Sequence, residues 1–334
     1  MKKYLLLAFA INALTLIFPL RGNCQGTGDQ YAVIKYSVNY MRIQPDYETA
    51  VETQELMGVP VRVLEADRYW RLIESPQPYK AWCTDKGLAM MSKEEVINYI
   101  AAPKYIVTEP WGRVYSQPSL KSQPICDIVM GDLMRIPEKP SAKRGFKKVL
   151  LPDGTEGWVK KGYIEDFRHW AENRKPDFEH ISRTALNFVG SPYLWGGMST
   201  KGFDCSGLVR YSYMMNGILL PRNASQMCHC GIQIPIDPSL PMSERISGLQ
   251  AGDLVFFGIP ATESQRERVT HVGIYLGDGM MIHSSHEVRI NSLLPNREDS
   301  YENAWKMIRA CRILGSEAAS STYLNNPAYF LQND

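Results

Sequence analysis

The chain has 334 residues, of which 44% are hydrophobic and 22% are charged, so disorder, a collagen-like repeat and a coiled coil are excluded as descriptions of the whole chain. Its 37 basic and 35 acidic residues leave a net charge of +2, which provides no large field to bind nucleic acid by charge alone. The length leaves room for two or three domains of roughly 100–200 residues each.

The N-terminus has the layout of a secretory signal peptide. A short basic head precedes an uncharged stretch at residues 4–20, and Gly22 and Cys24 are small residues at the −3 and −1 positions of a cut before Gln25. Residues 1–24 are therefore predicted to be removed. The mature protein is expected to be exported to the periplasm or cell envelope, without stable membrane insertion. An uncleaved anchor helix and lipidation of Cys24 are the alternatives.

Two stretches, residues 30–92 and 104–166, are both rich in β-branched and aromatic residues and in turn signals. They share these landmarks at nearly constant spacing: Gln44-Pro45 with Gln117-Pro118 and Met57-Gly58 with Met130-Gly131, each 73 residues apart, and Trp82 with Trp158, 76 residues apart. Self-similarity at one spacing indicates two copies of one supersecondary unit. Copies of this size, made of short strands, favour small barrels.

The repeat resembles bacterial SH3-type domains, most clearly in the Gly-Trp-Val segment at residues 157–159. The resemblance implies two small all-β SH3-like barrels, the first at residues 25–100 and the second at residues 101–168. We expect Trp82 and Trp158 to pack in the barrel cores.

After residue 170 the pattern changes to helices followed by strands. Helices are expected at residues 180–189 and at residues 208–216, the latter capped by Gly217. Strands are expected at residues 254–257, 272–276 and 280–283. This order indicates an α+β domain, assigned to residues 169–316 and followed by a C-terminal tail at residues 317–334.

Cys205 is the candidate nucleophile. Asp204 and Ser206 flank it at the start of an apolar helix, where they can satisfy the free N–H groups of the first turn. The positive end of a helix and a neighbouring histidine both favour a thiolate. The backbone N–H of Cys205 would face a developing oxyanion. A buried, inert cysteine is the alternative.

His271 is the candidate partner of that thiol. In the alternating strand that contains it, His271, Gly273 and Tyr275 share one face. A three-residue hairpin loop would pair His283 with Gly273, on the face of His271, whereas a two-residue loop with ideal pairing would put His283 on the opposite face. In that second case His286 would be the rival orienting residue.

Four segments in order resemble the NlpC/P60 cell-wall peptidases: FDCSGLV at residues 203–209, GDLVFF at 252–257, HVGIYLG at 271–277 and IH at 282–283. The resemblance implies a compact papain-like fold over roughly residues 175–315. It also implies a Cys-His-polar triad, in which Cys205 is the nucleophile, His271 the general base and acid, and His283 the residue that orients His271.

The whole arrangement resembles the γ-D-glutamyl-L-diamino-acid endopeptidases. These cleave between D-Glu and diaminopimelate or Lys in peptidoglycan stem peptides with a free N-terminal L-Ala. The resemblance implies that a tyrosine of the first SH3-type domain contacts the free amine, and Tyr79 is the candidate. An acidic residue of the same domain should pair with the amine, and Glu48, Glu52 and Glu55 remain open.

Further substrate-binding candidates follow from the same resemblance. Tyr193 and Trp195 are expected to wall the cleft, Asp204 and Ser206 to flank the nucleophile, and Ser225 to donate a hydrogen bond to substrate. Arg222 is a second candidate on the same rim, and Asp253 is expected to support a turn.

No cofactor and no metal site are predicted. Cys228-His229-Cys230 places three ligand types together, but no second cluster with standard zinc spacing follows. Seven cysteines are an odd number. Cys24 is expected to leave with the signal peptide, Cys205 to stay a free thiol, and the remaining five to be mostly buried and unpaired.

The sequence therefore predicts a cysteine endopeptidase that cleaves peptidoglycan stem peptides, in recycling rather than in cutting intact wall. A non-catalytic cell-wall-binding protein is one alternative. An amidase or acyltransferase on the same fold is the other.

Overall fold

The computed structural model describes residues 30–76 and 79–322. The predicted signal peptide, residues 1–24, lies outside the described residues, as does most of the predicted tail. Among the residues that are described, no helix is long and apolar enough to cross a membrane.

The first sheet has seven strands in the order β3-β2-β6-β5-β4-β1-β7. Its elements are β1 (Gln30–Ile34), β2 (Val38–Arg42), β3 (Val51–Leu56), β4 (Pro60–Asp67), β5 (Trp70–Glu74), β6 (Lys80–Thr84), the 3-10 turn η1 (Asp85–Gly87), β7 (Leu88–Met91) and the following helix α1 (Lys93–Ala101). Ser92 begins α1 with a capping box, because its side chain accepts from the backbone of Glu95 while the Glu95 carboxylate accepts from the backbone of Ser92.

The second sheet repeats this order as β10-β9-β14-β13-β11-β8-β15, with β12 added beside β13. Its elements are β8 (Lys104–Val107), β9 (Trp111–Tyr115), β10 (Pro124–Val129), β11 (Leu133–Arg135), β12 (Ala142–Lys143), β13 (Phe146–Leu150), β14 (Glu156–Lys160), η2 (Lys161–Tyr163), β15 (Ile164–Asp166) and α2 (Phe167–Glu172). Strand for strand the two orders correspond, so the predicted repeat of one supersecondary unit is confirmed.

The two barrels predicted for these units are not what the structure contains, because neither sheet closes on itself. In the first sheet β3 and β7 are the unpaired ends of the order. Helix α1 packs on β1 and β7, and a strand of the C-terminal part, β16 (Met198–Ser199), packs on β3. Helix α2 packs in the same way on β8 and β15. The sheet ends are thus covered by other elements rather than joined to each other.

The prediction that Trp82 and Trp158 fill barrel cores is also wrong. Both side chains are only half-buried, whereas their strand neighbours Cys83 and Val159 are fully buried. Successive side chains of a strand point to opposite faces, so the small or branched neighbours face the core and the tryptophans do not.

The two Met-Gly landmarks form the joint between the sheets. Gly58 has φ +90° and Gly131 has φ +94°, a conformation that side chains with a Cβ atom rarely adopt. The N–H of Leu133 donates to the Met57 carbonyl at 2.9 Å, and the Met57 N–H donates to Asp132 Oδ1 at 3.1 Å. The repeated turns therefore hold the two copies together directly.

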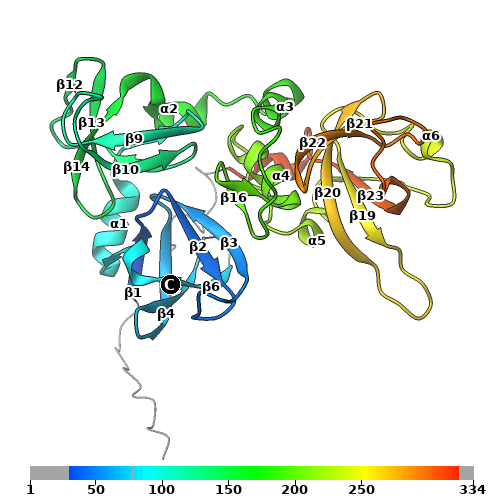
Figure 1. Ribbon diagram of the computed structural model, residues 1–334, viewed down its shortest axis with the longest axis horizontal. Helices are drawn as coiled ribbons and strands as arrows, with labels where there is room; N and C mark the ends of the chain where they lie inside the picture. The colour runs from blue at the N-terminus through cyan, green and yellow to red at the C-terminus, as the bar shows by residue number, and fades with distance from the viewer. Residues whose placement is uncertain (1–29, 77–78, 323–334) are drawn as a thin grey trace, which may run out of the picture.

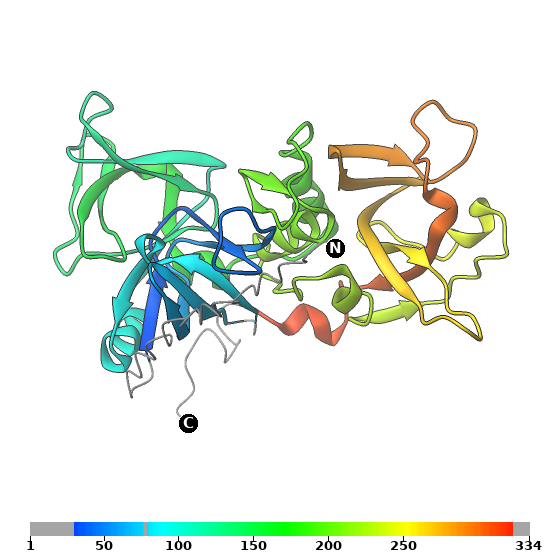
Figure 2. The same cartoon turned by 60° about the horizontal axis from the view of Figure 1, so that its bottom comes forward.

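The C-terminal part runs from α3 to β23 and is an α+β unit, as predicted. Figures 1 and 2 show its helices α3 and α4 between the two N-terminal sheets and a six-stranded antiparallel sheet of order β18-β23-β19-β20-β21-β22. Its elements are α3 (Phe178–Leu186), β16 (Met198–Ser199), β17 (Gly202–Phe203), α4 (Cys205–Met214), α5 (Ala224–Met227), β18 (Ile232–Ile234), α6 (Met242–Arg245), β19 (Leu254–Ile259), β20 (Arg268–Gly277), β21 (Met280–Ser285), β22 (Glu287–Ser292), η3 (Ala304–Lys306) and β23 (Met307–Arg312); η4 (Glu317–Ser320) follows.

One apolar core runs through all three units. It contains Met41 and Leu56 of the first sheet, Val129 of the second, and Leu208 and Tyr211 of α4. The Tyr211 hydroxyl donates to the carbonyl of Met130, in the second Met-Gly turn, at 2.5 Å. Because every residue of α4 after Cys205 is buried, both N-terminal sheets and the six-stranded sheet fix the position of this helix.

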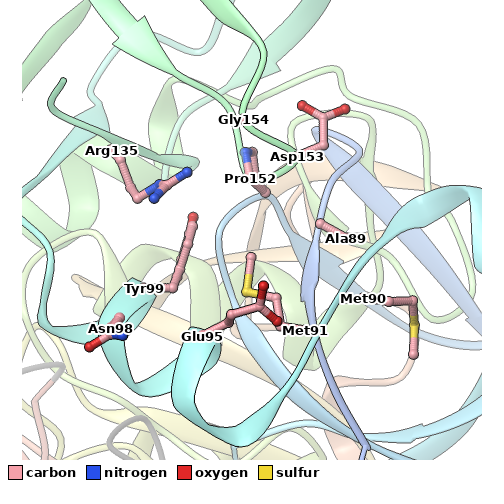
Figure 3. A pocket seen from close by; sticks show the side chains of 10 residues that line it. All are labelled: Ala89, Met90, Met91, Glu95, Asn98, Tyr99, Arg135, Pro152, Asp153 and Gly154. Carbon is pink, nitrogen blue, oxygen red and sulfur yellow. The ribbon is translucent and has the colours of Figure 1, made fainter.

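A pocket of about 510 Å³ lies between the first and second sheets. It is lined by β7 and α1 on one side and by Arg135 and the turn at residues 152–154 on the other. Figure 3 shows the Tyr99 ring below Arg135, whose guanidinium carbon is 5.3 Å from the ring centroid. Cys205, His271 and His283 do not line this pocket, so it is separate from the candidate active site.

The six cysteines within the described residues are unpaired, as predicted. Cys83, Cys228 and Cys311 are buried, and the other three are half-buried.

Gly58→Ala tests the joint between the sheets. A Cβ at Gly58 would lie 2.4 Å from the Leu133 carbonyl oxygen, whereas a Cβ at Gly145, with φ +79°, meets nothing within 4 Å. Both substitutions strain the backbone, but only Gly58→Ala adds a clash. It should therefore lower the free energy of unfolding by about 1–3 kcal/mol more than Gly145→Ala. Urea unfolding of both variants measures this difference, and equal losses would contradict it.

Candidate active site

Cys205 is the first residue of α4, and Asp204 is its N-cap. Asp204 Oδ1 accepts from the backbone N–H of Gly207 at 2.6 Å, which satisfies one of the free donors at the helix start. A Cβ at Gly207 would lie 1.9 Å from the Gly197 carbonyl oxygen. Glycine at this position therefore lets the Gly196-Gly197 turn lie directly on the first turn of the nucleophile's helix.

A buried ion pair supports this helix start. Arg222 reaches both carboxylate oxygens of Asp204, at 3.1 and 2.6 Å, and also donates to Ser206 Oγ at 3.0 Å. Its Nε donates to Thr53 Oγ1 of β3 at 2.8 Å. Burial opposes the charged guanidinium, but the Asp204 carboxylate outweighs it and raises the pKa of Arg222. Arg222 thus ties the nucleophile's helix to the first sheet.

Asp204 and Ser206, predicted to touch substrate, are committed to internal contacts. Their side chains bond to each other at 3.1 Å as well as to Arg222, and they are only 9% and 5% exposed. In this structure they position Cys205, and a direct contact of either with substrate stays a prediction.

The hairpin of β20 and β21 decides where His283 points. Ile274 pairs with Ile282 and Tyr275 with Met281, and a bulge follows before Gly277 pairs with Met280. The loop itself is the two residues Asp278 and Gly279, but the bulge shifts the register by one. This register puts His283 opposite Gly273, on the face of His271, which is the parity that the catalytic interpretation requires.

The two imidazoles are hydrogen-bonded. His271 Nε2 lies 2.7 Å from His283 Nδ1, and His283 Nε2 lies 2.9 Å from Asn291 Oδ1. Because Nε2 of His271 is used in this way, its Nδ1 is the nitrogen left for the thiol. His286, the rival orienting residue, is exposed, and its carbonyl accepts from the backbone N–H of Tyr193.

The sulfur of Cys205 lies beside the His271 strand. The backbone N–H groups of Ser206 and Val272 both favour its anionic form, and Val272 is the residue after His271. Burial, together with the Asp204 charge, outweighs them and raises the pKa of the Cys205 thiol to about 12. Burial therefore opposes the thiolate more strongly than the N–H groups of the helix start and of Val272 favour it.

Burial also keeps both histidines neutral. It lowers the pKa of His271 to about 3 and that of His283 to about 4, and the charge of Arg289 acts in the same direction on both. The Tyr301 ring covers the pair, with its centroid 5.6 Å from His271 and 4.7 Å from His283. At neutral pH the site thus holds a protonated thiol beside a neutral imidazole that can act as its base.

Tyr79 lies on the catalytic side of the first sheet. Its hydroxyl donates to Glu52 at 2.6 Å and is hydrogen-bonded by the side chain of Asn223, the neighbour of Arg222. Burial and Glu52 raise the pKa of Tyr79. Of the three acidic residues left open by the sequence, the structure pairs Glu52 with Tyr79.

The other two acids point elsewhere. Glu55 is buried near Arg210 and Arg222, and burial raises its pKa. Glu48 lies on the exposed loop between β2 and β3, where its backbone N–H donates to Asp46.

The remaining predicted residues lie at different depths. Tyr193 is half-buried, and burial, with Cys205 and Asp204 close by, raises the pKa of its hydroxyl. Trp195 is 66% exposed, and Ser225 is on the exposed side of α5. Asp253 supports a turn as expected, because it accepts from the Gln250 N–H and binds Arg312.

Sequence reasoning missed Asn291 and Tyr301 and placed Arg222 only on a rim. The parity argument could have reached Asn291, since β22 pairs with β21 and puts Asn291 on the face of His283. No sequence signal marks Tyr301, which approaches the histidines from the loop after β22. Arg222 is separated from Asp204 by 18 residues, and no motif spacing links them.

The chain has relatives among known proteins. The model of the NlpC/P60 family matches residues 190–309. A γ-D-glutamyl-L-lysine dipeptidyl-peptidase of Bacillus cereus is 30% identical over 259 residues, which cover 75% of this chain and 72% of the relative. The dipeptidyl-peptidase 6 of Lysinibacillus sphaericus is 26% identical over 75% of this chain and 87% of its own length.

A solved structure shares the architecture. The crystal structure of an NlpC/P60 family protein from Bacillus cereus is similar with a TM-score of 0.68 at 26% identity, over 84% of this chain and 99% of that one. The similarity therefore includes the two N-terminal sheets as well as the part around Cys205. The chain belongs to the NlpC/P60 family and is a cysteine peptidase.

Proposed function

We propose that this protein hydrolyses the bond between γ-D-Glu and the following diamino acid, diaminopimelate or Lys, in peptidoglycan stem peptides. The observation that carries the proposal is the start of α4, where Cys205 lies beside a strand that presents His271 bonded to His283 at 2.7 Å. The relatives named as γ-D-glutamyl-L-lysine dipeptidyl-peptidases support the choice of bond.

The chemistry begins from the neutral pair. His271 takes the thiol proton as the sulfur of Cys205 attacks the γ-carbonyl carbon, and the resulting imidazolium gives that proton to the leaving amine. Water, deprotonated by His271, then attacks the acyl-enzyme, and the released sulfur regains a proton from the imidazolium. The backbone N–H of Cys205, at the positive end of α4, is positioned to stabilise the oxyanion in both steps.

The first sheet provides the proposed selectivity for a free N-terminal L-Ala. Glu52 is the acceptor of the Tyr79 hydroxyl, and a carboxylate with a phenol beside it suits an ammonium group. Arg222 binds Asp204, and its guanidinium is close enough to both Tyr79 and Cys205 to interact with them electrostatically. A site bounded by the first sheet in this way favours short, free-ended stems, which supports a role in muropeptide recycling.

The same function places the protein where peptidoglycan is found. We propose that it is exported to the periplasm or cell envelope after removal of residues 1–24, and that the two N-terminal sheets serve as SH3-type units of the enzyme.

Cys205→Ala should abolish cleavage of L-Ala-γ-D-Glu-diaminopimelate by the purified protein, because the thiol is the nucleophile. Cys230→Ala, which removes another half-buried thiol, should leave the rate unchanged. Mass spectrometry of the digests measures the cleavage rates of both variants. The digestion is repeated with intact sacculi as substrate and with an added amine. Full activity in Cys205→Ala would contradict the mechanism, and transfer to the amine in place of water would identify an acyltransferase.

The pH dependence of kcat/KM should show no group that titrates at the usual pKa of a histidine. Because burial holds the pKa of His271 at about 3, the neutral base persists in acid, and kcat/KM for the free stem peptide should stay constant from about pH 7 down to about pH 5. Intrinsic fluorescence over the same range checks that the protein stays folded. A fall in kcat/KM with a midpoint near 6.5, the usual value for imidazole, would show that His271 titrates normally.

Glu52→Gln tests the amine site. Hydrogen bonds to charged groups contribute about 1.5–3 kcal/mol, so Glu52→Gln should lower the ratio of kcat/KM for free over N-acetylated L-Ala-γ-D-Glu-L-Lys by at least about tenfold. Glu48→Gln, on the exposed loop, is the matched control and should keep the wild-type ratio. If the two variants behave alike, Glu52 does not bind the amine.

A further inference from the structure

Asn291 continues the line of hydrogen bonds behind the two histidines. It lies on β22, and its register with β21 puts it on the same face as His283. Its Oδ1 is 2.9 Å from His283 Nε2, and its Nδ2 donates to the Asp299 carbonyl oxygen at 2.8 Å. His283, between Asn291 and His271, is completely buried.

The Asp299 carbonyl fixes which way the Asn291 amide faces. A carbonyl oxygen can only accept, so the NH₂ group of Asn291 must point toward it. The same carbonyl also accepts from the backbone N–H of Ser292 at 2.9 Å, and Tyr301 returns a bond to the Ser292 carbonyl at 2.8 Å. These backbone bonds hold the Asp299 carbonyl in place, so it fixes the amide nitrogen of Asn291 and leaves the amide oxygen to face His283.

The direction of every proton in the line then follows. Asn291 Oδ1 can only accept, so His283 Nε2 carries the hydrogen. A neutral imidazole carries one such hydrogen, so His283 Nδ1 is an acceptor and His271 Nε2 must be the donor across the 2.7 Å contact. The hydrogen of His271 is thereby placed on Nε2, and its Nδ1 keeps a free lone pair.

We propose that Asn291 is a positioning residue that sets the tautomers of both histidines and so leaves Nδ1 of His271 unprotonated as the base for Cys205. The proposal rests on the proposed function in one respect, the assignment of Cys205 and His271 as nucleophile and base. Asn291 binds His283 and the Asp299 carbonyl, and it acts on His271 only through His283.

The surroundings of the pair favour this single-proton state. Arg289, which pairs with Glu302 at 3.5 Å, opposes a second proton on either ring. With both imidazoles neutral, the tautomer decides whether a base is present, since a hydrogen on Nδ1 of His271 would leave no lone pair for the thiol.

The first experiment reads the tautomers directly. Long-range proton–nitrogen NMR of the full protein labelled with nitrogen-15 histidine, assigned with His271→Gln and His283→Gln, should show the hydrogen on Nε2 of both residues. In Asn291→Leu, which removes the acceptor, the two residues should populate both tautomers. In Asn291→Asp, whose carboxylate also only accepts, His283 should keep its hydrogen on Nε2. A wild-type hydrogen on Nδ1 of either residue, or an unchanged spectrum in Asn291→Leu, overturns the proposal.

The second experiment measures the consequence for the reaction. Asn291→Leu should lower kcat by on the order of tenfold to a hundredfold, the range known for losing the partner behind a metal-binding histidine, with KM within about twofold. Gln233→Ala, which removes an exposed amide on β18 at the far edge of the same sheet, should change neither constant. Thermal melting identifies a variant that does not fold. If Asn291→Leu does not fold, the wild-type and Asn291→Asp spectra decide.

Alkylation of Cys205 by iodoacetamide, followed by mass spectrometry, separates this proposal from the proposed function because it needs no substrate. Slower alkylation in Asn291→Leu, together with the expected spectra, supports the proposed role of Asn291 even if no stem peptide is cleaved. Unchanged alkylation in a folded Asn291→Leu variant overturns it. Full peptide cleavage by Cys205→Ala would instead remove the assignment on which it rests.

Discussion

The buried ion pair between Asp204 and Arg222 is the interaction on which the site depends. Taking two charges out of water is costly, and removal of one partner from such a pair typically costs about 3–5 kcal/mol because the other charge is left uncompensated. Here the geometry offsets the cost, since the guanidinium binds both carboxylate oxygens and finds further partners in Ser206 and Thr53. The pair thus fixes the first turn of α4 and the edge of the first sheet in one unit.

Because of this arrangement, the N-terminal sheets are packed against the active-site part of the molecule and are not separate domains on a flexible linker. Gln54, next to Thr53, accepts from the Met198 N–H and from Ser199 at 2.8 Å each. Tyr211 of α4 binds the second Met-Gly turn, and the apolar core is continuous through all three units. A rigid joint of this kind fixes the first sheet, with Tyr79 and Glu52, relative to α4 without relying on a flexible linker.

The histidine side of the site is a second rigid unit, built on strands. The bulge in β20 restores the parity that a two-residue loop alone would have broken, and β22 then adds Asn291 behind His283. Asn291 is held by the Asp299 carbonyl. The line of hydrogen bonds that sets the histidine tautomers therefore begins in the loop between β22 and β23. Burial of both rings makes the tautomer important, because both imidazoles are neutral in the resting site and each carries its single hydrogen on one nitrogen.

Local periodicity and motifs with fixed spacing were enough to predict the repeat, the α+β character of the C-terminal part, and Cys205, His271 and His283 as the candidate catalytic residues. The sequence also led to Tyr79, although not to its partner among Glu48, Glu52 and Glu55. Tertiary structure alone decided that neither sheet closes, since α1, α2 and β16 cover the ends, and that the Cys205 thiol rests protonated, since burial outweighs the helix start. Arg222, Tyr301 and the anchor of Asn291 were likewise decided only by packing, because each acts across elements whose separation along the chain carries no periodic signal.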